Sequence, residues 1–143
     1  MFQRRFGNLH GIDGIDSILQ TVFQYRKKDP ASLDEEECIH NLFNCICSIL
    51  SIPDNQSKFR LGEGFELMMR CLKELKYAAL CAVRVINYAI TDNRPNAEKF
   101  VEVGGLKHIF PMVMGRGLPQ VVAFFFFMKI QKTLELKLRQ ILL

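Results

Sequence analysis

The chain of 143 residues lacks several features that would indicate a function directly. Its 19 basic and 15 acidic side chains leave a net charge of only +4, which is too weak and too dispersed to indicate nucleic acid binding. The longest apolar run, residues 121–128, is far shorter than the roughly 20 residues that cross a bilayer. No apolar stretch of a signal peptide follows the first basic residues. We therefore expect neither a direct nucleic acid contact nor a membrane contact.

The chain also lacks the residue patterns of metal, phosphate and catalytic sites. Its five cysteines are an odd number in or near apolar runs, which favours reduced thiols over a disulfide framework. Cys45 and Cys47, with Cys38 and His40 nearby, do not form the paired C-x₂₋₄-C elements of structural zinc, and we interpret the cysteines as core thiols. No phosphate-loop signature and no nucleophile with a base and an orienting acid is visible. We expect no catalytic residue, no metal and no cofactor.

What the sequence does contain is helical periodicity. Apolar residues recur at steps of three and four, without sustained period-two alternation outside the termini, which predicts an all-α protein. Breaks fall at prolines and glycines. The expected helices cover residues 12–28, 33–51, 55–61, 65–75, 77–91, 96–103 and 106–114.

A short motif is written twice within this pattern. In FRLGEGFELM (residues 59–68) and FVEVGGLKHI (residues 100–109), an aromatic residue is followed at the fifth position by a glycine, and the copies are 41 residues apart. Leu9 and Gly14 form a weaker third copy. We attribute the glycine to a turn with positive φ between two helices. Repeats of roughly 40–47 residues with two or three helices are typical of HEAT and armadillo arrays.

The repeat leads to a prediction of fold and domain organisation. We expect a right-handed armadillo/HEAT-like helical solenoid of about two and a half repeats. Residues 1–8 would be an N-terminal flank, 9–117 the armadillo-like repeat segment, and 118–143 an apolar, basic C-terminal helix or divergent tail. The phenylalanines at 124–127 span more than a helical turn and cannot all be buried against one neighbour. Self-association of the isolated chain is therefore expected.

Polar residues fall on one stripe of each long helix. The helix 77–91 is apolar around most of its circumference, which indicates burial on most sides. Its polar positions have counterparts 43 residues earlier in the helix 33–51. We predict that this stripe faces a partner in a groove; the alternative is that it is only the solvated side of each helix. The polar stripe comprises Asn41, Asn44, Ser48, Arg84, Asn87 and Thr91.

Three consecutive acidic residues, Glu35, Glu36 and Glu37, begin the first long helix. Carboxylates in a first turn stabilise their own helix through its dipole, by about 0.3–1 kcal/mol each. The alternative interpretation is an acidic contact for basic partner peptides. The two interpretations are compatible.

Four segments together resemble a known family. They are NLFNCICSIL (41–50), KFRLGEGFELM (58–68), ALCAVRVINYAI (79–90) and KFVEVGGLKHIFP (99–111). In order and spacing, over about residues 9–114, they are similar to the beta-catenin-like protein 1 family of spliceosome-associated armadillo proteins. The resemblance implies a non-enzymatic protein-binding scaffold in the nucleus that acts in pre-mRNA splicing. It further implies partners that present nuclear-localisation-type peptide segments, such as splicing factors.

The absence of tryptophan argues against one related interpretation, a nuclear import receptor. Armadillo grooves of import receptors pair asparagines with tryptophans that stack on lysine stems, and this chain has no tryptophan. A nuclear import adaptor is therefore disfavoured. Periodicity alone supports a generic cytoplasmic HEAT/armadillo adaptor equally well, and this alternative stays open.

Overall fold

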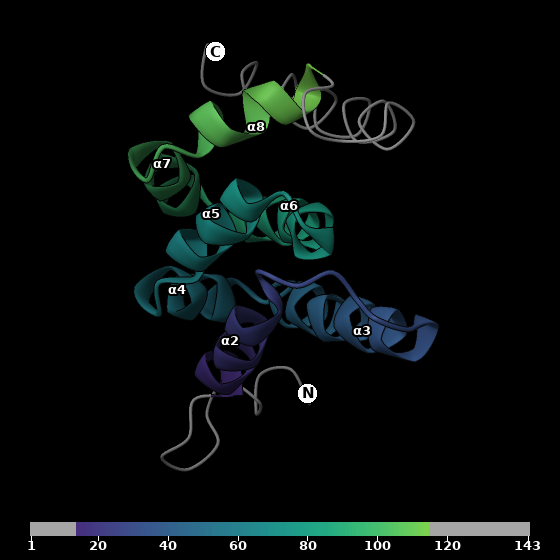
Figure 1. The fold of residues 1–143 in the computed structure, drawn as a ribbon. Coiled ribbons are helices and arrows are strands. Elements are labelled where there is room, and N and C mark those ends of the chain that lie inside the picture. Colours follow the sequence, from purple (N-terminus) through teal and green to yellow (C-terminus); the bar gives the residue numbers. More distant parts are fainter. Residues whose placement is uncertain (1–13, 115–143) are drawn as a thin grey trace. The chain divides into compact units, whose positions relative to one another are not determined.

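The computed structural model describes residues 14–114, apart from the side chain of Val113, and these residues contain helices and no strand. The flank 1–8 and the tail 118–143 lie outside the described residues. The chain divides into two units, Met1–Gly105 and Leu106–Leu143. Figure 1 shows the described helices, which are α2 (Gly14–Tyr25), α3 (Leu33–Ile49), α4 (Pro53–Leu61), α5 (Gly64–Glu74), α6 (Tyr77–Ile90), α7 (Arg94–Glu102) and α8 (Gly105–Val113).

Local capping chemistry explains where these helices begin. The main-chain N–H of Glu35 donates to Ser32 Oγ (3.1 Å), and the Glu35 carboxylate accepts from the N–H of Ala31 (2.7 Å), so α3 starts with a reciprocal capping arrangement. Proline occupies the first turn of both α4 and α7, where its missing N–H is not needed. All seven predicted helices are confirmed among the described residues, with ends shifted by at most a few positions.

The repeated aromatic–glycine motif is a packing contact. A Cβ added at Gly64 would lie 2.5 Å from the ring of Phe59, and one added at Gly105 would overlap the ring of Phe100. Phe59 is fully buried and meets Phe65 edge to face, with ring centroids 5.3 Å apart, so its ring is held by its neighbours. The motif therefore needs glycine because an aromatic ring lies on its backbone.

The expectation that the motif glycine supplies a positive φ is wrong. Among the described residues, the positive φ falls one position earlier in each copy, at Glu63 (φ 59°) and Gly104 (φ 80°), which are again 41 residues apart. Glycine adopts this conformation freely, whereas glutamate is strained in it. The two copies thus share one backbone geometry with different residues at the left-handed position.

A pair of buried asparagines repeats with the same 41-residue period. Asn55 Nδ2 donates to the carbonyl of Ile49 (3.0 Å), and Asn96 Nδ2 donates to the carbonyl of Ala89 (2.8 Å). Both side chains are almost completely buried, at 1% and 0% exposure. Each asparagine therefore ties a short helix to the end of the long helix before it, where carbonyls lack intrahelical partners.

Gln56 extends this connection between α4 and the end of α6. Its Nε2 donates to the carbonyls of Tyr88 (3.0 Å) and Thr91 (3.1 Å), and its Oε1 accepts from Asn93 Nδ2 (3.0 Å). Asn96 Nδ2 donates to the carbonyl of Gln56 (3.0 Å). The loop after α6 is therefore held by side chains that replace the missing helical partners.

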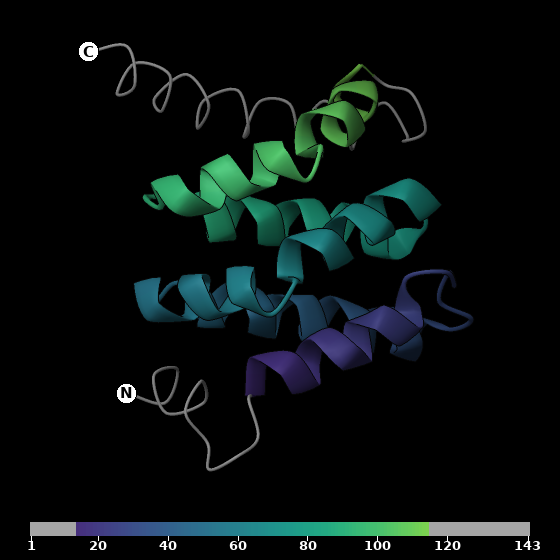
Figure 2. The ribbon, with the colours of Figure 1, turned by 90° about the vertical axis from the view of Figure 1, so that its left-hand side faces the viewer.

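The helices of the first unit pack around a continuous apolar core. α6 contacts α3, α4, α5 and α7, and α2 contacts α3, α4 and α5. Figures 1 and 2 show the long helices α3 and α6 one above the other on one side, with the short helices α4 and α7 stacked on the other side. The largest fully buried side chains of this unit include Phe43, Phe59, Phe65, Leu72 and Ile86.

Candidate partner-binding surface

The two long helices α3 and α6 lie side by side and run in the same direction. Near their N-terminal ends the Tyr77 phenol interacts with the Glu36 carboxylate, and further along both helices the Arg84 side chain interacts with the Cys47 thiol. These two contacts, together with the packing of α3 on α6, define a parallel pair. The repeat-related polar positions of the two helices therefore follow one another in the same order along the pair.

Only one strip of α6 reaches the surface. Eight of its residues are buried, from Ala78 to Ala89, and they surround most of the helix. The partly open positions include Arg84 and Asn87, and Tyr88 beside them is 43% exposed. The helix is thus buried on most sides, as its composition predicted.

On α3, the predicted residues of the polar stripe are accessible. Asn41 and Ser48 are exposed, and Asn44 is half-buried. Within residues 14–114, the side chains of Asn41, Asn44 and Asn87 make no hydrogen bond. Three amides with free donors and acceptors therefore lie on the two helices, available to another molecule.

Thr91 belongs to the end of α6. Its hydroxyl donates to the carbonyl of Asn87 (2.6 Å), and its own carbonyl accepts from Gln56. This back-bond satisfies a carbonyl in the last turn of the helix. The Thr91 side chain is therefore already used within its own helix.

Arg84 is the charged residue of the stripe, and it is half-buried. Its Nε and Nη2 atoms are covered and have no hydrogen-bond partner. The Cys47 and Cys81 thiols lie close enough to interact electrostatically with its positive charge. Burial raises the pKa of both thiols, that of Cys81 to about 11, so neither supplies a negative charge near neutral pH.

The three acidic residues at the start of α3 have three different roles. Glu35 caps its own helix through Ala31 and Ser32. Glu36 faces Tyr77, and burial, then the negative charges near it, raise the pKa of that phenol. Glu37 is exposed and makes no ion pair within the described residues. Only Glu37 is therefore free to meet a basic partner.

The cysteines divide between core and surface. Cys47, Cys71 and Cys81 are buried, and burial raises the pKa of Cys71 to about 12. Cys38 and Cys45 are exposed, so the interpretation of all five as core thiols is wrong for these two. They lie on the outer face of α3, because the residues of that helix that face the core recur at steps of three and four, at Ile39, Phe43 and Ile46. In the described part of the chain, no three His, Cys, Asp or Glu side chains are grouped to hold a metal ion.

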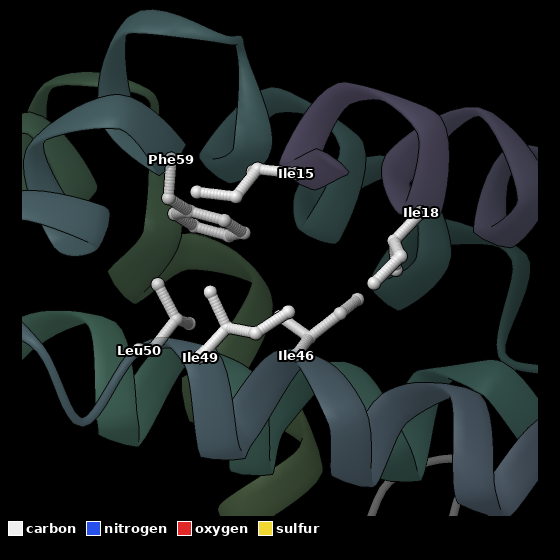
Figure 3. Close-up of a pocket in the computed structure, with 6 residues that line it drawn as sticks. All are labelled: Ile15, Ile18, Ile46, Ile49, Leu50 and Phe59. Carbon is white, nitrogen blue, oxygen red and sulfur yellow. The ribbon is translucent and has the colours of Figure 1, made fainter. Parts of the chain in front are cut away.

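A small apolar gap lies between α2, α3 and α4 (Figure 3). Its volume is about 10 Å³, close to the least that one water molecule needs, and its lining offers no polar partner. It is therefore a packing defect and not a ligand site. The lining residues are Ile15, Ile18, Ile46, Ile49, Leu50 and Phe59. Among residues 14–114, no helix combines the length and apolarity needed to cross a membrane.

Sequence reasoning missed the residues that surround Arg84. Tyr77 and Cys81 precede it by seven and three positions on α6, which is the spacing of one helical face. That spacing was a usable signal. The contribution of Cys47 from α3 depends on how the two helices pack and has no signal in the sequence.

Over residues 14–114, these observations define an all-helical chain with an internal repeat and a parallel pair of long helices that carry free polar side chains. The family described as "Catenin-beta-like, Arm-motif containing nuclear" has a model that matches residues 2–123, and the chain belongs to this family. It is similar to Beta-catenin-like protein 1 of Rattus norvegicus and of Homo sapiens, each 36% identical over 105 residues that cover 72% of this chain and 19% of the relative. The Beta-catenin-like protein 1 homolog of Schizosaccharomyces pombe is 34% identical over 105 residues, again 72% of this chain and 19% of the relative. The chain thus matches about a fifth of the length of these curated relatives.

Proposed function

We propose that the chain is a non-enzymatic, armadillo-type protein-interaction scaffold. Residues 9–117 would form a right-handed solenoid of about two and a half repeats, in which α3 and α6 are equivalent helices of successive units. Membership of an Arm-motif family supports this proposal, as does the recurrence of Asn55, Phe59 and Gly64 at Asn96, Phe100 and Gly105. The observation that supports the proposal most directly is the parallel pair of helices α3 and α6, whose asparagine side chains make no hydrogen bond within the described residues.

We further propose that the scaffold acts in the nucleus, in association with the spliceosome during pre-mRNA splicing. The family description includes the word nuclear, which favours this location over a cytoplasmic adaptor. The partners would be proteins, among them splicing factors that present nuclear-localisation-type segments. The exposed Glu37 provides a contact for one basic side chain of such a segment.

The polar stripe would bind an extended peptide through its main chain. A peptide strand carries alternating N–H and C=O groups that need partners once water is displaced. A carboxamide offers both a donor and an acceptor, so Asn41, Asn44 and Asn87 can satisfy both kinds of group. Sequence-independent binding of this kind suits a scaffold with several partners, and specificity then depends on charged neighbours.

A comparison of variants in extracts tests the proposal. The tagged full chain is used to capture proteins from nuclear and cytoplasmic extracts, with quantification by mass spectrometry. We expect spliceosomal proteins from the nuclear extract, and a strong loss with the triple variant Asn41→Ala, Asn44→Ala, Asn87→Ala. The control variant Gln24→Ala, Lys73→Ala alters exposed polar residues on α2 and α5 and should capture normally.

Two outcomes would contradict the proposal in different ways. Capture of cytoplasmic proteins with no spliceosomal component would favour the generic adaptor. Equal capture by the wild type and the triple variant would show that the stripe is only a solvated helix face. Circular dichroism of each variant verifies that the helices are retained.

A further inference from the structure

We propose that the α3–α6 face selects partner segments that present an aspartate or glutamate side chain to Arg84. The occupant is an extended segment of another protein, with one carboxylate at this position. The inference rests on the proposed function, because it assumes that the polar stripe is the partner surface. To that function the inference adds the sign of the charge on the partner residue that contacts α6.

The Arg84 guanidinium is covered without being neutralised. Two of its nitrogens, Nε and Nη2, are buried and lack any hydrogen-bond acceptor. Among the described residues it forms no ion pair, whereas Lys76, Arg94 and Lys99 each do. An arginine side chain remains protonated in proteins, so a full positive charge is held here.

The groups around Arg84 cannot supply the missing negative charge. The Cys47 and Cys81 thiols stay protonated because burial raises their pKa values. The Glu36 carboxylate lies near Tyr77 and Cys81 and interacts with the Tyr77 phenol. No carboxylate oxygen of the described residues is within ion-pair distance of the guanidinium.

A carboxylate from outside would complete this arrangement. Leaving a buried donor without an acceptor destabilises a protein, and charged donors are affected most. A carboxylate can accept two parallel hydrogen bonds from a guanidinium, a geometry that lysine cannot match. Arg84 is only half-buried and lies on the open strip of α6, so a partner carboxylate can approach it, and the covered Nε and Nη2 become accessible once the side chain turns toward this strip.

The same charge determines which residue is rejected. A lysine or arginine of a partner opposite Arg84 would meet an unscreened like charge. Basic residues of a nuclear-localisation-type segment should then lie toward Glu37 at the start of α3, away from Arg84. The face therefore favours a segment of mixed charge over a continuous basic run.

Labelled peptides with the full chain test this inference directly. Three decapeptides are used in which alanine alternates with glutamate, glutamine or lysine, and binding is followed by fluorescence anisotropy. We expect the glutamate peptide to bind about tenfold tighter than the glutamine peptide. Arg84→Gln should remove that preference, and Arg84→Lys should restore part of it.

Arg70→Gln provides the matched control. Arg70 is exposed on α5, so this variant changes the net charge of the chain by the same amount away from the stripe. It should leave the preference for glutamate intact. Equal losses in Arg84→Gln and Arg70→Gln would overturn the inference, since they would indicate a general electrostatic attraction.

The remaining outcomes separate this inference from the function on which it rests. If Asn87→Ala weakens binding of the glutamine peptide while Arg84→Gln leaves the preference unchanged, the charge selection is wrong and the stripe remains the partner surface. If neither substitution alters the binding of any peptide, both proposals fail. Tighter binding of the lysine peptide by the wild type would also contradict the inference.

Discussion

Asparagine has opposite roles in two regions of this molecule. On the short helices, Asn55 and Asn96 are buried and donate to main-chain carbonyls. On the long helices, Asn44 and Asn87 are partly open, and their side chains make no hydrogen bond within the described residues. Both pairs recur at similar spacing, so periodicity alone does not distinguish structural residues from the proposed binding residues. The difference lies in whether an unpaired carbonyl is within reach.

The largest effect is expected from Asn96→Ala. The substitution removes the buried side-chain donor to the carbonyls of Gln56 and Ala89, and we expect a loss of about 2–4 kcal/mol in unfolding free energy. Thermal melting by circular dichroism should show a fall of roughly 10 °C or more. Asn41→Ala is the matched control and should melt within about 2 °C of the wild type. Similar melting of both variants would remove the distinction between the two regions.

Gly64→Ala should have the next largest effect. Its methyl group would meet the buried Phe59 ring at 2.5 Å, and overpacking of this kind destabilises by about 1–3 kcal/mol. Chemical denaturation measures the loss. Gly62→Ala is the comparison variant and should lose less, because its added Cβ would approach the Lys58 carbonyl to 3.3 Å, a milder contact than that at Gly64. The double variant Phe59→Leu, Gly64→Ala should lose less than the sum of the two single variants; additive losses would show that ring and glycine do not interact.

Asn87→Ala should affect binding while leaving stability nearly unchanged. We expect a partner to bind more weakly by about 1–2 kcal/mol, or roughly five- to thirtyfold in Kd. Isothermal titration calorimetry with a captured partner measures the loss. If the variant instead binds normally and melts several degrees lower, Asn87 resembles Asn96 and the comparison fails.

Glu63→Gly should stabilise the chain slightly. Glu63 holds a φ of 59°, and glycine adopts this conformation without steric strain, as Gly104 does in the second copy. We expect a gain of about 0.5–1 kcal/mol in chemical denaturation. Glu63→Ala retains the strain and serves as the control. A loss of stability in Glu63→Gly would mean that the glutamate side chain stabilises the turn.

The smallest effect concerns pH. The Asp29 carboxylate accepts from Lys76 Nζ and from the N–H of Tyr77, both at 3.0 Å, and these bonds hold its pKa below the usual value. Its contribution is therefore present above the unfolded pKa and is lost as pH falls through the lower folded pKa. The stability gap between wild type and Asp29→Asn should close below about pH 4. Glu74→Gln, at an exposed site, should show no such gap; a gap that widens in acid would contradict the assignment.

The helices could be predicted from sequence because their signals are local. The three acids at 35–37 indicated the start of α3, and Pro53 and Pro95 indicated where the long helices end. The structural role of the repeated aromatic–glycine motif could not be predicted from local signals in this way. Glu63 takes the strained conformation although a glycine stands on each side, because Gly64 is required beneath the ring of Phe59.

The candidate site was predicted only in outline. The spacing of polar residues placed Arg84 and Asn87 on one strip of α6, and the structure locates both there. The covering of the Arg84 nitrogens depends on how deeply α6 packs against α3, which no residue pattern records. The structural role of Asn55 and Asn96 was missed although the sequence contains a signal for it. In both copies of the motif, an asparagine stands four positions before the phenylalanine, which stands five positions before the glycine.

The contact between an aromatic ring and a helix-starting glycine also limits how this chain can change over generations. Phe59 cannot shrink alone without opening a void, and Gly64 cannot enlarge alone without a collision. The two positions are expected to vary together among descendants, and each copy of the motif forms its own coupled pair. Duplication or loss of a repeat would add or remove both residues of such a pair together. The number of aromatic–glycine pairs in a longer relative should therefore equal the number of its repeats.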